Sequence, residues 1–177
     1  FKPLGMIDTQ FYLKSDKEER LVSVQTKKDG KWVDFYDDRF NVNYPFQGSK
    51  SIFFGGCGLT STVKDYAKFV QMVLNKGRFN GNQIIGKKTA ETMLTGQGYL
   101  SWGSEVSLGF SLMKDDLYST GIGGSKGTFS TGGYWNTSAF ADPVENIIGI
   151  IYKQTYDIGN DPTSAAFRRL VFQSIIE

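Results

Sequence analysis

Four short stretches of the sequence carry residue types that could act on a carbonyl group. A serine stands three residues before a lysine in Ser61-Thr62-Val63-Lys64 and again in Ser111-Leu112-Met113-Lys114, the spacing of a serine nucleophile and its lysine base. A tyrosine precedes an asparagine by two residues in Tyr134-Trp135-Asn136, and two hydroxyl residues precede two glycines in Ser130-Thr131-Gly132-Gly133. The chemistry to weigh is therefore acyl transfer through a serine.

The composition removes most other catalytic chemistries. The chain has 177 residues, no histidine and one cysteine, Cys57, which reads as a small residue in a crowded glycine-rich turn. Without histidine, Ser-His-Asp and Cys-His catalysis and the commonest metal ligand are excluded, and one cysteine allows neither an internal disulfide nor a cysteine-based zinc site. We expect no metal and no organic cofactor.

Charge and hydropathy also limit the partners. The sequence is 40% hydrophobic and 15% aromatic, enough for a sizeable core. Its 20 basic and 18 acidic residues are interspersed and give a net charge of +2, so nucleic acid is not an expected partner. The longest aliphatic run, Ile147–Ile151, is too short to cross a bilayer.

Apolar residues at helical spacing predict three helices. The first covers Thr62 to Leu74, where Thr62 and Asp65 resemble a capping box and Gly77 supplies a stop. A shorter helix is expected over Lys87–Thr95, and an amphipathic helix over Ala165–Ile176 ends the chain.

Turn residues and alternation predict extended segments. Lys31–Tyr36 alternates like a strand after the turn pair Asp29-Gly30, and residues 37–50 read as a loop. Asn80-Gly81 predicts a second tight turn.

The last third of the chain reads as strands over Ser107–Met113, Gly127–Ala141 and Asn146–Thr155. The link Asp142–Glu145 is too short for a parallel crossover, so the last two strands should pair antiparallel. Helices followed by an antiparallel sheet and a closing helix predict the α+β class.

Four longer stretches occur in order along nearly the whole chain: Pro3-Leu4-Gly5-Met6-Ile7-Asp8-Thr9, Gly55 to Phe69, Ile84-Ile85-Gly86-Lys87-Lys88-Thr89, and Gly127-Thr128-Phe129-Ser130-Thr131-Gly132-Gly133. Together they resemble the second half of the β-lactamase-related serine hydrolases, a group of class C β-lactamases, penicillin-binding D,D-peptidases and esterases. The resemblance implies an incomplete β-lactamase/transpeptidase-like fold. Residues 1–100 would belong to the helical subdomain, and residues 101–177 would form three antiparallel strands and the terminal helix.

The same resemblance implies a mechanism and a site. In the family a serine followed three residues later by lysine forms an acyl-enzyme with an amide or ester carbonyl, and a Tyr/Ser-x-Asn motif helps to move protons. By the family's pattern, Ser130, Thr131 and Gly132 would line the substrate edge, and Gly133 would give an oxyanion N–H. The family often has lysine where this chain has Ser130, which disfavours a carboxylate-bearing β-lactam and affects an ester or small peptide-like substrate less. Without the resemblance, Gly132 and Gly133 would be interpreted as a strand bend or β-bulge where the backbone is closely packed.

Three stretches of this chain imitate the family's Ser-x-x-Lys and Tyr/Ser-x-Asn motifs, but none lies where the family has them. Ser61 lies in the helix after the glycine-rich turn, and the side chains of Ser111 and Lys114 would point to opposite faces of a strand. Tyr134-Trp135-Asn136 would sit on the strand that carries Thr131-Gly132, and one strand cannot form both walls of a cleft. The nucleophile is therefore expected in a missing N-terminal half of the same domain, and the isolated chain is predicted to be inactive.

Two functions follow as hypotheses. The first is the C-terminal part of a serine hydrolase that acts on a small-molecule or peptide-like amide or ester. The alternative is a non-catalytic module that binds cell-wall peptides or sugars through the glycine-edged strand and the tryptophans. Only the resemblance favours an extracytoplasmic or periplasmic location.

Overall fold

The structure is a computed structural model that describes residues 1–37, 41–48, 50–56, 58–99, 105–115, 123–159 and 161–176. The expectation for Cys57 falls outside these residues. The described elements are, in chain order, the 3₁₀-helices Lys2–Leu4 and Ser15–Arg20, β1 (Gln25–Lys28), β2 (Lys31–Asp34), α1 (Tyr44–Gln47), α2 (Val63–Leu74), β3 (Arg78–Phe79), β4 (Asn82–Gln83), α3 (Lys87–Met93), β5 (Gly98–Tyr99), β6 (Glu105–Val106), β7 (Ser111–Leu112), β8 (Phe129–Gly132), β9 (Ser138–Asp142), β10 (Ile147–Ile151) and α4 (Thr163–Gln173).

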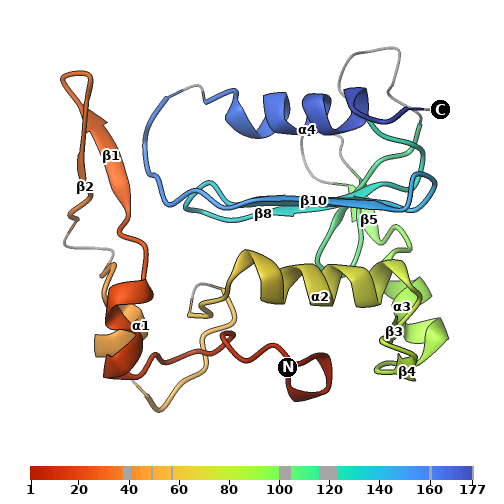
Figure 1. The fold of residues 1–177 in the computed structure, drawn as a ribbon, viewed down its shortest axis with the longest axis horizontal. Coiled ribbons are helices and arrows are strands. Elements are labelled where there is room, and N and C mark those ends of the chain that lie inside the picture. Colours follow the sequence, from red (N-terminus) through yellow and green to blue (C-terminus); the bar gives the residue numbers. More distant parts are fainter. Residues whose placement is uncertain are drawn as a thin grey trace.

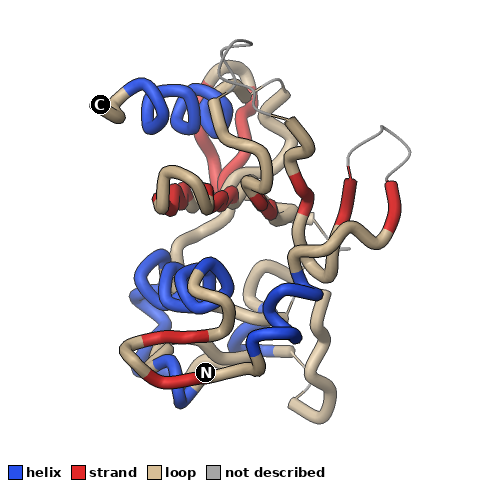
Figure 2. Tube along the Cα trace, turned by 90° about the vertical axis from the view of Figure 1, so that its right-hand side faces the viewer, coloured by secondary structure: helices blue, strands red, loops and turns tan. Residues whose placement is uncertain are grey.

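The elements form three layers, with α4 on one face of a central antiparallel sheet and α2 on the other (Figure 1; Figure 2). Within the described residues this sheet has six strands in the order β10-β9-β8-β7-β6-β5. Hairpins β1–β2 and β3–β4 lie outside it. The α+β prediction is confirmed. No helix in the described part of the chain has the length and apolar character needed to span a bilayer.

The predicted helix α2 forms because its ends are capped and one face is apolar. The Thr62 side chain accepts a hydrogen bond from the Asp65 N–H, as a capping box requires. At the other end both Lys76 and Gly77 have positive φ angles, of 53° and 87°, and the Gly77 N–H bonds the Met72 carbonyl at 2.8 Å. Val70, Met72 and Val73 on this helix are buried in the core.

Several sequence predictions need correction in detail. Residues 37–50 are not loop throughout, because Tyr44–Gln47 forms the short helix α1. The predicted strand over 127–141 is two strands, β8 and β9, joined by a turn. Residues 107–110 form the turn between β6 and β7, so three predicted strands are replaced by a six-stranded sheet.

Strand register gives the sheet two different faces. Phe129 pairs with Ala141, and both pack with α2 in the core cluster. Neighbouring Phe140 points to the opposite face, where its ring centroid lies 5.4 Å from that of Phe172 on α4. Gly149 pairs with Phe140, and a Cβ at Gly149 would overlap that ring.

The carboxylate of Asp142, at the end of β9, is completely buried. It accepts hydrogen bonds from the Ser125 N–H at 2.7 Å and the Thr128 hydroxyl at 2.8 Å, both in the segment that leads into β8. It also accepts from the N–H groups of Val144 and Glu145 in the turn to β10. Burial alone would raise the pKa of Asp142, but these hydrogen bonds outweigh burial and lower the pKa below its ordinary value of 3.8.

We predict that Asp142→Asn lowers the free energy of unfolding at pH 7 by about 3 kcal/mol, because an amide N–H₂ then faces buried N–H donors. Since the folded-state pKa of Asp142 is depressed, its ionisation stabilises the fold fully above pH 4. That contribution declines as the pH falls from the unfolded pKa through the folded one. Urea unfolding of both proteins from pH 7 to pH 2 measures the difference. A difference that does not shrink below pH 4 would contradict this account.

Candidate active site

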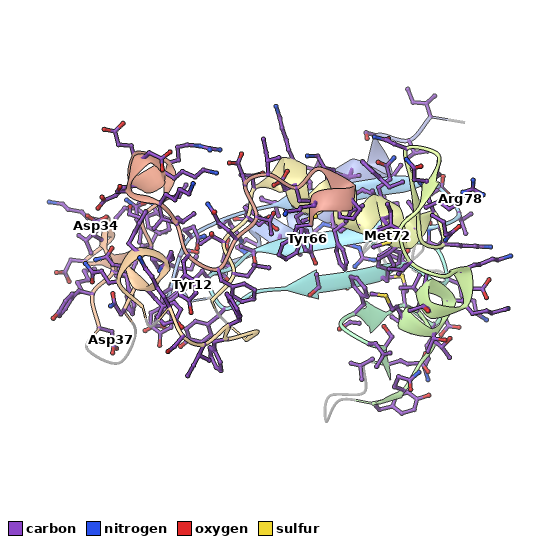
Figure 3. The ribbon with its side chains drawn as sticks, turned by 90° about the horizontal axis from the view of Figure 1, so that it is seen from below. Tyr12, Asp34, Asp37, Tyr66, Met72 and Arg78 are labelled. Atoms are coloured by element: carbon purple, nitrogen blue, oxygen red, sulfur yellow. The ribbon has the colours of Figure 1, made fainter. Side chains whose placement is uncertain are left out.

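A pocket of about 310 Å³ opens between the α2 layer and one end of the sheet. Its lining comes from the glycine-rich segment before α2, from α2 itself, and from β8, β9 and the end of β10: Gly55, Gly56, Leu59, Tyr66, Thr131, Gly132, Thr137, Ser138, Ala139 and Tyr152. Figure 3 labels Tyr66 and Met72 on α2, which lies against the sheet. None of the described residues that line the pocket is charged.

The N-terminal segment holds the glycine-rich wall in place. Gln10 and Thr60 exchange two backbone hydrogen bonds of 3.1 and 2.9 Å. Asp65, which is 3% exposed, accepts from the Asp8 N–H at 2.7 Å and from the Thr9 hydroxyl at 3.1 Å. This edge of the pocket therefore depends on residues 8–10.

Neither Ser-x-x-Lys stretch forms a nucleophile and base pair. The Ser61 hydroxyl lies 2.8 Å from that of Thr9, while Lys64 is exposed, and no described hydrogen bond joins Ser61 to Lys64. Ser111 is on β7, and the Lys114 ammonium contacts the hydroxyl and ring of Tyr99. Among the described hydrogen bonds neither serine is joined to the lysine three residues later, and that neither serine is a nucleophile stays a prediction.

Tyr134-Trp135-Asn136 lies in the turn between β8 and β9, which corrects its predicted position on a strand. Asn136 adopts a left-handed conformation with φ of 64°, one that asparagine tolerates. Its side chain donates to the Thr155 hydroxyl at 3.0 Å, and the Trp135 carbonyl accepts from the Thr155 N–H. This asparagine fastens the turn to the chain beyond β10.

Alternation along β8 separates two of the predicted substrate residues. Thr131 pairs with Ala139 and lines the pocket with it. Ser130 pairs with Phe140, whose ring packs on α4, so the Ser130 side chain lies on the opposite face of the sheet. The position of Ser130 counts against its predicted contact with substrate, while the roles of Thr131 and Gly132 stay predictions.

Backbone direction also counts against the predicted role of Gly133. Its N–H donates to the Thr137 carbonyl at 3.0 Å and closes the β8–β9 hairpin. Because N–H groups alternate along a strand, the N–H of Gly132 points away from β9. On that side the pairing with β7 ends at Ser130, so within the described residues no strand pairs with Gly132, and this part of β8 is its uncovered edge. Gly132, and not Gly133, directs its N–H toward the uncovered edge of β8.

Two tyrosines in the pocket were not predicted as site residues. Tyr66 reads as one more apolar position of a helix and Tyr152 as the end of a strand, so no local pattern marks either. Burial raises the pKa of both phenols, and the pKa of Tyr152 is raised further by the proximity of Tyr66. Both side chains are therefore neutral at ordinary pH. Among the described residues no cluster of His, Cys, Asp or Glu could hold a metal ion.

The family model for Beta-lactamase matches residues 1–172. The chain belongs to the Beta-lactamase family. Its curated relatives include Protein Rv1367c of Mycobacterium tuberculosis strain H37Rv and the uncharacterized protein MT1414 of strain CDC 1551. Each is 28% identical in an alignment of 163 residues, and the alignment covers 82% of this chain and 39% of the relative.

Solved structures give the same fold for this Beta-lactamase family chain. EstCE1, a hydrolase with promiscuous acyltransferase activity, superposes with a TM-score of 0.77 at 19% identity over 97% of this chain and 48% of its own. The simvastatin synthase LovD from Aspergillus terreus has a TM-score of 0.75 at 20% identity, and the match covers 97% of this chain and 46% of LovD. A penicillin-binding protein homologue from Pyrococcus abyssi has a TM-score of 0.64 at 19% identity. The match covers 97% of this chain and 35% of that protein. The chain thus has a β-lactamase/transpeptidase-like serine hydrolase fold and spans about half or less of the length of these proteins.

The close approach of Gly133 to Thr137 gives a stability prediction. A Cβ at Gly133 would overlap the Thr137 hydroxyl oxygen, although the φ of Gly133 is not in the left-handed region. We expect Gly133→Ala to lower the free energy of unfolding by about 1–3 kcal/mol through overpacking.

Thr137→Ala in the same chain removes the oxygen and should restore most of this loss. Chemical unfolding of the two single variants and the double variant measures the coupling energy between the positions. Additive effects would show that the two residues do not touch in solution.

Proposed function

We propose that this chain forms one side of a serine hydrolase active site that transfers an acyl group from an ester or amide through an acyl-serine. The nucleophile and its lysine come from a segment outside the 177 residues. The observation that supports this most is the pocket between the glycine-rich segment and the uncovered edge of β8, where Gly132 presents its backbone.

In the proposed reaction the chain contributes binding and electrostatic stabilisation. The Gly132 N–H is the candidate donor to the oxyanion that develops on the acyl carbonyl, in place of Gly133. Thr131 and the neighbouring residues of β9 form the adjoining wall. The hydrolase and acyltransferase activity of EstCE1 supports acyl transfer as the reaction type.

An uncharged substrate fits this site better than a carboxylate-bearing β-lactam. The pocket has no cation among its described lining residues, and Ser130 could not replace one because its side chain lies on the other face. A buried carboxylate without a cationic partner would lose its hydration without compensation.

The position of the nucleophile can be tested by covalent labelling. A fluorophosphonate should label the full-length parent protein on a serine N-terminal to Phe1, and peptide mass spectrometry would locate the adduct. No label on any serine would support the non-catalytic binding module instead. A label on Ser61 or Ser111 would overturn the proposed division of the site.

The isolated chain of 177 residues is the matched control. It should hydrolyse p-nitrophenyl esters and nitrocefin no faster than a denatured sample, because Ser61 has no described base. Turnover that Ser61→Ala abolishes would contradict the proposal.

Two neighbouring proline substitutions in the full-length protein test the oxyanion donor. Gly132→Pro deletes an N–H that does not bond β9, so kcat for an ester should fall by ~10²–10³. A Cβ at Gly132 would lie 3.2 Å from the Thr137 carbonyl oxygen, so Gly132→Ala, which keeps the N–H, is the control for crowding. Gly133→Pro deletes the hydrogen bond to Thr137 and should lower Tm markedly. Active-site titration and thermal unfolding separate the two effects. Unchanged kcat in a folded Gly132→Pro protein would remove Gly132 from the mechanism.

A further inference from the structure

Two tyrosines that are distant in the chain meet in the pocket. Tyr66 comes from the first turns of α2, and Tyr152 follows the last residue of β10. Their ring centroids lie 6.1 Å apart with an interplanar angle of 43°. Both residues line the pocket together with Gly132, so the two tyrosines and the candidate oxyanion donor border the same space.

The rings of these tyrosines are explained by packing, but their hydroxyl groups are not. Tyr66 packs on the core cluster, with its ring centroid 5.8 Å from that of Phe69. Neither hydroxyl is among the buried polar atoms without a partner in the described residues, and both tyrosines line the pocket, so their hydroxyls are accessible from it. A hydroxyl that is accessible in the pocket can donate a hydrogen bond to a bound molecule, which a phenylalanine at the same position could not do.

We propose that Tyr66 and Tyr152 bind an uncharged oxygen of the substrate, such as an ether, carbonyl or hydroxyl oxygen, by donating hydrogen bonds into the pocket. This inference rests on the proposed function, because it assigns the chemistry of the group that the pocket holds during acyl transfer. It makes the two tyrosines determinants of substrate specificity.

The surroundings favour a neutral acceptor over a charged one. Both phenols keep their protons at ordinary pH because burial disfavours the phenolate. The other described lining residues are glycines, alanine, leucine, threonines and serine, which offer no charge to compensate a carboxylate. From this chain a carboxylate would gain no cation, whereas a neutral oxygen would exchange water for phenol donors at little cost.

The experiment is an ether scan with the full-length protein. It compares three pairs of p-nitrophenyl esters in which an oxygen replaces one methylene: methoxyacetate and butyrate, 3-methoxypropionate and pentanoate, 4-methoxybutyrate and hexanoate. At one position of the oxygen or more, the parent protein should prefer the ether over its methylene partner in kcat/KM, after correction for uncatalysed hydrolysis. The anionic p-nitrophenyl glutarate should be a poorer substrate than the ethers.

Tyr66→Phe and Tyr152→Phe keep the rings and remove only the hydroxyls. Each should reduce the preferred ether-to-methylene ratio by roughly three- to tenfold and leave the ester of the methylene acid nearly unchanged, as expected for the loss of one neutral hydrogen bond. Tyr99→Phe on β5 is the matched control, since Tyr99 is exposed outside the pocket and contacts Lys114. It should leave the ratio unchanged.

The outcomes separate this inference from the function on which it rests. If the parent hydrolyses none of the esters, the proposed function fails and the tyrosine assignment falls with it. If the parent is active but no ether is preferred, or if the phenylalanine variants slow both members of a pair equally, only the tyrosine assignment is overturned. A preference for the glutarate would overturn it as well.

Discussion

The buried carboxylate of Asp142 is the interaction on which the arrangement of the sheet depends. It joins the segment before β8 to the turn after β9 through four hydrogen bonds, so it fixes where β8 begins and where β9 ends. A slip of one residue in either strand would move every side chain to the other face. The same slip would exchange Thr131 with Ser130 in the pocket and Gly132 with Gly133 at the uncovered edge. A carboxylate that faces α4 thus determines which groups are presented on the α2 side.

A second buried carboxylate gives the opposite wall its position. Asp65 receives hydrogen bonds from Asp8 and Thr9, and its ion pair with Lys68 has an N–O distance of 2.9 Å. Burial by itself would raise the pKa of Asp65, but these partners lower it, so the group remains ionised near neutral pH. The glycine-rich segment is thereby held between the N-terminal residues and α2. The pocket lies where the walls set by Asp142 and Asp65 meet, and both carboxylates are used for structure.

The sequence predicts those features that depend on neighbours in the chain. The periodicity of α2 and the pairs Asp29-Gly30 and Asn80-Gly81 are local signals, and the structure confirms the elements that they predict. The direction of an N–H on β8 depends on its partner strand, so the family pattern alone could not choose between Gly132 and Gly133. The turn at 133–137 uses Asn136, where a glycine would have marked the left-handed position. The sequence does not show that Tyr66 and Tyr152 lie together, because their contact depends on the packing of α2 against β10.

The neutrality of the pocket constrains how the proposed reaction divides between the two parts of the protein. Acyl transfer from an ester needs a group that takes a proton from the nucleophile and returns it to the leaving group. The chain has no histidine, and its phenols in the pocket are held neutral by burial, which makes them donors and poor bases. Proton transfer in the proposed mechanism therefore falls to the segment that carries the nucleophile. In this division the chain binds the acyl group and donates hydrogen bonds to it. Both tasks favour an uncharged lining, because hydrogen-bond donors act most strongly where water and competing ions are excluded.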